Sequence, residues 1–206
     1  MDVATPLGPA RALTTEPPGD VVGTLVLGHG AGGGADAPDL VAVSDAAAAE
    51  GWRALRVEQP WRVAGKRIAP APTRLDVAWT AVLETLRDDG LLAGPVVFGG
   101  RSAGARVACR TAMALGATGV LALAFPLHPP GRPEKSRADE LLGAGVPVLV
   151  VQGETDAFGR PEDVAAVLAG RPDASVYAVP GDHSLKQNPA LVAAAVLHWL
   201  AEPPRS

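Results

Sequence analysis

The strongest chemical signal in the sequence is a serine, Ser102, within the motif GRSAG at residues 100–104. An apolar segment of strand character at residues 95–98 precedes the motif, and a helical pattern follows it. A serine on such a sharp strand-to-helix turn is exposed to substrate, and glycines two residues away leave room for the tight backbone. Free N–H groups at the helix start favour the oxyanion of acyl transfer. The motif therefore predicts a serine nucleophile.

A serine hydroxyl needs a base to take its proton, and the sequence supplies a histidine and a carboxylate after later strand-like segments. His183 comes soon after the segment 175–179, and Asp156 comes soon after the segment 146–151. The carboxyl ends of parallel strands meet at one edge of a sheet, so the three side chains are expected to converge. We expect Ser102 to be the nucleophile, His183 the base and Asp156 the acid that orients the histidine.

Other interpretations of these residues stay open at this level. Glu154 lies in the same segment as Asp156 and competes for the acid role. Asp182 adjoins His183 in sequence, which makes it a poor partner for the far ring nitrogen. Ser102 as an ordinary helix N-cap and His183 as a surface loop histidine are the non-catalytic alternatives.

The elements that must position these residues form a regular alternation of strand-like and helical segments, without an internal repeat. This alternation is typical of an α/β domain with a mostly parallel sheet and helices on both faces. We expect residues 1–20 to form an edge hairpin or a loose segment and residues 21–202 to form a single domain without a separate lid. Strands are expected at residues 21–27, 52–57, 95–98, 120–125, 146–151 and 175–179, helices at 38–50, 73–89, 102–115, 138–142, 161–168 and 189–200, and a loop at 60–72.

Together, the motifs HGAGG, GGRSAG, AFPLHPPG, QGETD and GDHS resemble those of the α/β-hydrolase superfamily, over roughly residues 20–200. The sequence is most similar to the lidless, dienelactone-hydrolase-like branch, which includes a testis-expressed protein and a subunit of the NSL histone-acetylation complex. The resemblance implies the α/β-hydrolase fold and hydrolysis of ester-like or related acyl bonds. We expect cleavage of a small ester, thioester or related acyl bond through an acyl-enzyme, with no metal or organic cofactor. It implies the triad Ser102, Asp156 and His183 and the oxyanion donors Ala31 and Ala103.

The glycine-rich segment at residues 28–33 admits two interpretations. In a hydrolase its backbone supplies the second oxyanion donor, for which we choose Ala31 over Gly32, while His29 has a structural hydrogen-bonding role. The segment also matches G-x-G-x-x-G, and a glutamate ends the next strand, as in a dinucleotide-binding fingerprint. We disfavour a dinucleotide site, because the next helix is expected to begin near Pro38 and not inside the motif.

A second function class also fits the sequence, namely a non-catalytic binding or scaffold protein with the α/β-hydrolase fold. The resemblance includes branch members that act in complexes, and a fold by itself does not establish an activity. The intact positions of the predicted triad favour an enzyme.

Three residues near the predicted serine are expected to contact substrate: Trp61, Arg101 and His128. Several cations are also expected at this edge of the sheet. They form either a solvated loop surface or a site that attracts a substrate bearing a carboxylate or phosphate. These cations are Arg62, Lys66, Arg67, Arg101, Arg132, Lys135 and Arg137.

The composition restricts the classes of protein to which the chain can belong. A chain of 206 residues with 48% hydrophobic and 19% charged residues suits one domain with one sizeable core. Its net charge of -4 and the lack of a basic stripe argue against a nucleic-acid partner. The one cysteine, Cys109, is expected to be a small buried hydrophobe. The sequence has no leader pattern and no apolar run of membrane length, so we expect a cytoplasmic protein without a membrane partner. The expected partner is a small-molecule acyl substrate. The oligomeric state stays open.

Overall fold

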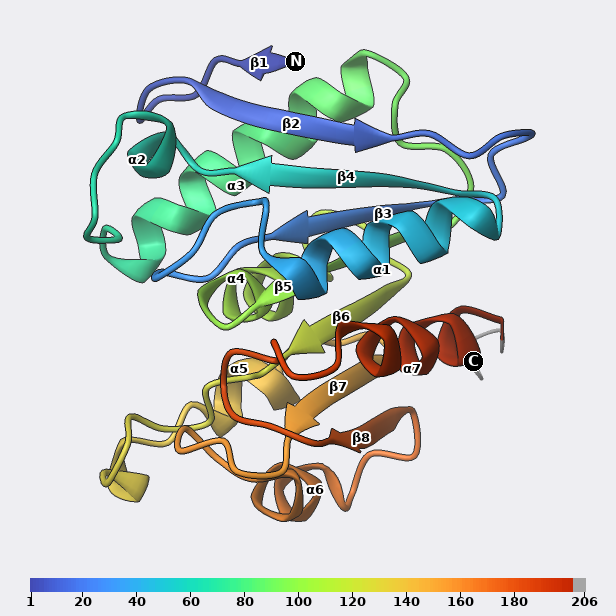
Figure 1. Ribbon diagram of the computed structural model, residues 1–206. Coiled ribbons are helices and arrows are strands. Elements are labelled where there is room, and N and C mark those ends of the chain that lie inside the picture. The colour runs from blue at the N-terminus through green and yellow to red at the C-terminus, as the bar shows by residue number, and fades with distance from the viewer. Residues whose placement is uncertain (202–206) are drawn as a thin grey trace.

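A computed structural model, in which residues 1–201 are described, has an eight-stranded sheet with helices on both faces (Figure 1). The strand order is β1-β2-β4-β3-β5-β6-β7-β8, and β3 to β8 run parallel. The expected mostly parallel α/β architecture is therefore confirmed. The expected domain end at residue 202 lies outside the described residues. The strands are β1 (Asp2–Val3), β2 (Ala10–Thr15), β3 (Gly23–Gly28), β4 (Trp52–Glu58), β5 (Val96–Arg101), β6 (Gly119–Leu123), β7 (Val148–Gly153) and β8 (Ala174–Val179).

Helices cover the two faces of the sheet as separate layers (Figure 1). Helices α1 and α7 pack on each other over one face, and α3 and α4 pack together over the other. No helix within residues 1–201 is long and apolar enough to cross a membrane. The helices are α1 (Pro38–Ala49), α2 (Pro60–Val63), α3 (Pro72–Asp88), α4 (Ala103–Thr111), α5 (Ala138–Leu142), α6 (Pro161–Leu168) and α7 (Pro189–Ala201), with a 3₁₀ turn at Pro133–Lys135.

Strand β3 shows why the sheet needs both layers. Its side chains are buried on both faces, as expected of a central parallel strand. Leu25 and Leu27 belong to the apolar cluster under α1 and α7, whereas Val26 between them belongs to the cluster under α3 and α4. Each fully buried leucine contributes about 1.5–3 kcal/mol of hydrophobic stabilisation, so this alternation holds both helical layers against the strand.

The N-terminal segment lies at one edge of the sheet. Strands β1 and β2 pair antiparallel with each other, and β2 pairs antiparallel with β4. The parallel part of the sheet is therefore extended by a two-stranded antiparallel edge.

The chain reverses its direction of travel across the sheet at β3, since β4 lies on one side of β3 and β5 on the other. Ligands bind α/β sheets at such a switch point, outside the carboxyl ends of the strands. Residues Gly28 of β3 and Gly100 of β5 lie opposite each other there. The switch point is therefore where the predicted serine and the glycine-rich segment meet.

The expected elements are present, most of them with boundaries within two residues of the expected ones, and three segments differ more. The segment at residues 60–72, expected to be a loop, begins with the short helix α2, whose proline at the first turn suits a helix start but whose four residues show no periodicity. Strand β5 continues to Arg101, beyond the expected end at residue 98, because its glycines carry no strand signal. Helix α4 begins only after Ser102, because Ser102 has non-helical dihedral angles, and it ends at Thr111, four residues before the expected end.

Candidate active site

Ser102 lies on a strained turn between β5 and α4. Its φ of 53° and ψ of -107° place a non-glycine residue at positive φ, which costs on the order of 1–3 kcal/mol and persists only when the surroundings enforce it. The backbone N–H of Ser102 donates to the Leu123 carbonyl at 2.9 Å, which ties the turn to β6. The serine occupies the N-cap position of α4 but makes no side-chain capping bond. Its hydroxyl is therefore available for another partner.

The glycines of the motif are required by the neighbouring strand as well as by the turn. A Cβ added at Gly104 or at Gly100 would collide with the carbonyl oxygen of Gly28. The sequence predicted a clash across the turn, and for Gly100 a contact of 2.9 Å to the Gly104 carbonyl carbon adds to it. The closer obstacle is the end of β3, so the motif also sets how closely β3 and the serine turn approach.

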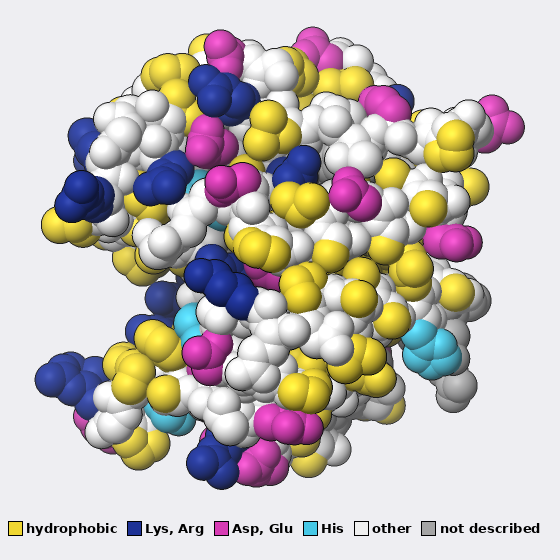
Figure 2. All heavy atoms as spheres, in the orientation of Figure 1, with side chains coloured by type: hydrophobic (Ala, Val, Ile, Leu, Met, Phe, Trp, Pro, Cys, Tyr) yellow, Lys and Arg dark blue, Asp and Glu magenta, His cyan; other side chains and the backbone are white. Residues whose placement is uncertain are grey.

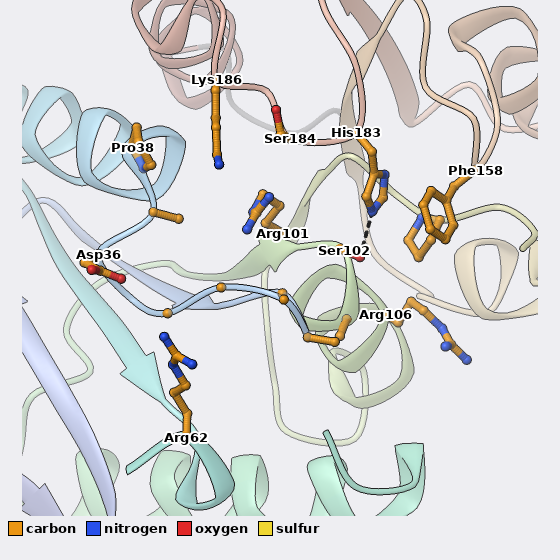
Figure 3. A pocket seen from close by; sticks show the side chains of 18 of the residues that line it. Asp36, Pro38, Arg62, Arg101, Ser102, Arg106, Phe158, His183, Ser184 and Lys186 are labelled. Atoms are coloured by element: carbon orange, nitrogen blue, oxygen red, sulfur yellow. Dashed lines mark hydrogen bonds between the residues drawn. The ribbon is translucent and has the colours of Figure 1, made fainter. Parts of the chain in front are cut away.

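The three predicted triad residues form one chain of hydrogen bonds. The Nδ1 atom of His183 lies 2.7 Å from Oδ2 of Asp156. Its Nε2 atom lies 2.9 Å from Oγ of Ser102, the bond drawn as a dashed line in Figure 3. Because an ionised carboxylate only accepts, Nδ1–H donates to Asp156 and Nε2 is left to accept the Ser102 hydroxyl. This tautomer is the one in which a histidine can act as a base toward serine.

The position of Asp156 is fixed by donors from its own loop. Its side chain is fully buried, and Oδ1 accepts from the backbone N–H of Phe158 at 2.8 Å. Its Oδ2 also accepts from Nε2 of Gln152 at 2.9 Å. Gln152 is fully buried at the end of β7 and bonds to both the N–H and the carbonyl of Phe125, so the carboxylate is tied to β6 as well. The competing Glu154 is exposed, and Asp182 binds Ser184 instead.

The loops that carry Asp156 and His183 are joined by backbone contacts. The N–H and the hydroxyl of Thr155 both donate to the Gly181 carbonyl, at 2.9 and 3.0 Å. A Cβ at Gly153 would lie 2.6 Å from the same carbonyl oxygen, so only glycine permits this approach. The ring of Phe158 stacks on His183 with centroids 4.2 Å apart. The histidine is thereby held on two sides.

The glycine-rich segment after β3 passes directly beside the serine. A Cβ at Gly30 would lie 3.4 Å from Cβ of Ser102. His29 fixes the start of the segment, because Nδ1–H donates to the Gly30 carbonyl at 2.9 Å and Nε2 accepts from the Gln59 N–H at 3.1 Å. Burial lowers the pKa of His29, although the bond to Gly30 opposes the shift. Helix α1 begins only at Pro38, as expected, and therefore not inside the glycine-rich motif as a dinucleotide site requires.

A cavity of about 570 Å³ opens over Ser102 and His183. Both predicted oxyanion donors, Ala31 and Ala103, line it together with these two residues. The N–H groups of a first helical turn have no partner inside the helix, so Ala103 at the start of α4 is suited to donate toward a ligand. The arrangement can hold a carbonyl group between a nucleophile, a base and backbone donors.

Of the residues expected to contact substrate, only Arg101 lines this cavity. Trp61 is buried against His29, with ring centroids 5.4 Å apart, and lines a separate inner cavity. His128 bonds to the Pro129 carbonyl through Nδ1 and holds the Phe158 loop through its own backbone N–H. Sequence proximity to strand ends placed these two residues near the site, but packing turns Trp61 inward and keeps His128 in its own loop.

The predicted cations do not all line the cavity over Ser102. Arg62, Arg101 and Arg137 line the cavity, whereas Lys66 lines a different groove. Arg67, Arg132 and Lys135 are exposed outside it. Inside the cavity wall, Nε of Arg101 lies 3.6 Å from Oδ2 of Asp39, a fully buried carboxylate.

Several residues of the site were not predicted from the sequence. Gln152 at the end of β7 and Phe158 in the following loop flank Asp156, and a polar side chain at the end of an apolar strand was the available signal for Gln152. Arg106 and Lys186 also line the cavity, at four positions after the serine and three after the histidine. Asp39 carried no signal, because a charged residue in the first turn of a helix usually faces water. Burial raises its pKa, and Arg101 opposes the shift.

The comparisons with known proteins agree with this geometry. A family model described as "Alpha/beta hydrolase domain" matches residues 22–193. Est1E from Butyrivibrio proteoclasticus, solved with ferulic acid, is similar in structure with a TM-score of 0.82, at 17% identity over 98% of this chain and 98% of that one. An α/β serine hydrolase without a lid from Xanthomonas campestris has a TM-score of 0.73, at 19% identity over 100% and 95% of the two chains.

A thermophilic esterase from Thermogutta terrifontis, solved with malate, has a TM-score of 0.70, at 16% identity over 100% of this chain and 99% of that one. At such identities these structures show the fold, which is the α/β-hydrolase fold of the lidless hydrolases. The family model spans most of the sequence, and the chain therefore belongs to the alpha/beta hydrolase domain family.

Proposed function

We propose that this chain is a serine hydrolase that cleaves small esters, thioesters or related acyl bonds through an acyl-enzyme. The observation that carries the proposal is the hydrogen-bonded chain Asp156–His183–Ser102, with distances of 2.7 and 2.9 Å. In the first step, Nε2 of His183 takes the Ser102 proton while Oγ attacks the carbonyl carbon of the substrate. Asp156 holds the required tautomer and stabilises the imidazolium that forms.

The intermediate of this reaction carries a negatively charged oxygen. The N–H groups of Ala31 and Ala103 would hold it, and such a donor contributes about 10²–10³ in kcat. When the intermediate collapses, the leaving group departs with the proton from His183 and the acyl group stays on Ser102. Water then attacks the acyl-enzyme, with His183 again acting as base, and releases the acid and free enzyme.

The shape of the site supports the proposed substrate class. The cavity over Ser102 is open, and the connections near it form loops and short helices rather than a separate cover. Similar structures are described with ferulic acid and with malate, which supports small substrates here. We also propose that the chain belongs to the dienelactone-hydrolase-like branch, on the motifs that it shares with that branch.

A serine-reactive fluorophosphonate probe tests the proposal directly. The unaltered protein and the variant Ser184→Ala are expected to be labelled, because Ser184 lines the same cavity but bonds to Asp182 and not to His183. The variant Ser102→Ala is expected to stay unlabelled. An unlabelled native protein, or equal labelling without Ser102, would contradict the proposal and favour a non-catalytic scaffold.

A further inference from the structure

The cavity over Ser102 is far more positive than the protein as a whole. The full chain has a net charge of -4. Only one carboxylate, Asp36, lines the cavity within the described residues, against several cations. Lys and Arg side chains gather around the hollow on this face of the molecule (Figure 2). The cations that line the cavity are Arg62, Arg101, Arg106, Arg137 and Lys186.

The cations on the α4 side of the cavity are already engaged. Arg106 binds Glu140 through two nitrogens, at 2.7 and 2.5 Å. Arg137 donates to the Pro126 carbonyl at 2.9 Å, and its pKa is lowered by burial and by the neighbouring Arg106. A new anion on this side would have to compete with these bonds.

The cations on the α1 side are less engaged. Arg62 of α2 and Lys186 of the loop after His183 have no carboxylate within ion-pair distance in residues 1–201. Figure 3 shows Arg62 and Lys186 pointing toward the glycine-rich segment from opposite directions, with Arg101 on the Lys186 side of that segment. The N-terminus of the twelve-residue helix α1 lines this part too, through Ala37 and Pro38.

Lys186 and Arg101 are close in the chain to the catalytic residues. Lys186 follows His183 by three residues, across Leu185, whose φ of 52° fixes a sharp turn. Arg101 precedes Ser102, and its guanidinium lies against the glycine-rich segment, where a Cβ at Gly33 would be 2.7 Å from Nη2. An anion on this side therefore sits at a set position relative to Oγ of Ser102.

We propose that Arg62 and Lys186, with Arg101 behind them, bind a carboxylate or phosphate group carried by the ester substrate. The substrate class is then an anionic ester or thioester, and this inference rests on the proposed hydrolase function. Carboxylate and phosphate share the negative oxygens that these donors recognise. Because Arg62 and Lys186 are exposed, added salt weakens the attraction.

The test compares four-carbon 4-nitrophenyl esters that differ in their far end: neutral butyrate, the carboxylate hemisuccinate and an ester ending in a phosphonate. At low salt, kcat/KM is expected to be higher for at least one anionic ester than for butyrate, by about tenfold or more, as a charge-assisted hydrogen bond provides. Whichever anionic ester is preferred identifies the group. The preference is expected to decline as NaCl is added.

The variant Arg62→Gln/Lys186→Gln is expected to lower the ratio of anionic to neutral kcat/KM by about tenfold or more. Arg132→Gln removes one exposed cation outside the cavity and is expected to keep the ratio. An equal ratio in the double variant and the unaltered protein, or no preference for either anion at low salt, overturns the proposal.

Binding separates this inference from the hydrolase proposal. Calorimetric titration of Ser102→Ala with succinate and with inorganic phosphate needs no turnover. The anion site is supported if either anion binds with millimolar or tighter affinity and if this binding is lost in the triple variant Ser102→Ala/Arg62→Gln/Lys186→Gln. This result would support the anion site even if fluorophosphonate labelling fails and contradicts the hydrolase proposal. No binding of either anion at low salt counts against the site, even in an active hydrolase.

Discussion

The variant Asp156→Asn tests the triad most sharply, because it removes a charge and keeps the side-chain shape. Oδ2 of Asp156 accepts from His183 and from Gln152, and Oδ1 accepts from the Phe158 N–H. An asparagine must place its NH₂ group at one of these two positions. If the NH₂ faces Phe158, the buried N–H loses its acceptor, at a cost of about 1–3 kcal/mol.

The other orientation is less costly for the fold and more harmful for catalysis. If the NH₂ faces His183 and Gln152, the amide of Gln152 still has the Gly159 and Phe125 carbonyls, at 2.7 and 3.2 Å, for its two hydrogens. The histidine must then carry its proton on Nε2, where it cannot accept from Ser102. We expect kcat to fall about 10³- to 10⁴-fold, with a loss of unfolding free energy below about 1.5 kcal/mol.

Steady-state hydrolysis of a 4-nitrophenyl ester and urea unfolding measure the two quantities on the same preparation. The matched controls are Glu154→Gln and Asp182→Asn, which alter the exposed carboxylates that competed for the acid role. Both controls are expected to keep kcat within about threefold, since neither contacts His183 through a hydrogen bond. A loss below tenfold in Asp156→Asn, or an equal loss in a control, would refute this reasoning.

Three further predictions concern the packing around the site. Gly104→Ala places a Cβ against the Gly28 carbonyl and is expected to lower the free energy of unfolding, measured in urea, by at least about 3 kcal/mol. In the control Gly32→Ala the new Cβ meets nothing within 4 Å, so the loss should be below about 1 kcal/mol. Equal losses in the two variants would contradict the clash. Burial lowers the pKa of His29, so the unfolded state takes a proton first as pH falls below about 6.5. As the pH decreases, the unfolding free energy should therefore fall by up to about 1.4 kcal/mol per pH unit. In His29→Asn this contribution to the pH dependence should be absent. Parallel plots of unfolding free energy against pH for the variant and the unaltered protein would argue against the prediction. Burial raises the pKa of Cys109 to about 12, so iodoacetamide at pH 8 should modify it only after unfolding; rapid modification of the native protein would contradict its burial.

The architecture was largely predictable because it depends on local patterns. The alternation of apolar strands and amphipathic helices gave the sheet, and α5 and α6 match their expected ranges to the residue. The errors occurred where local signals are weak. The last residues of strand β5 were not predicted because its glycines carry no strand signal, and the four residues of α2 were too few for a helical period to be visible.

The residues of the candidate site were predictable where strand ends determine position. Ser102, Asp156 and His183 follow strands β5, β7 and β8, and the parallel sheet brings these ends together. Trp61 and His128 also follow strands, yet the cavity over Ser102 is lined by other residues. A strand end fixes where a loop starts, but packing decides which way each of its side chains points.

The sequence by itself determined the α/β class, the strand-to-helix turn at the serine and the set of residue types that could perform acyl transfer. Only the tertiary structure decided that Asp156, and not Glu154 or Asp182, bonds to His183. Only the tertiary structure also placed Lys186 in the wall of the cavity that Ser102 lines. The physical reason is that periodicity and propensity act over a few residues of backbone, whereas distances between loops depend on strand order and on side-chain packing across the whole sheet.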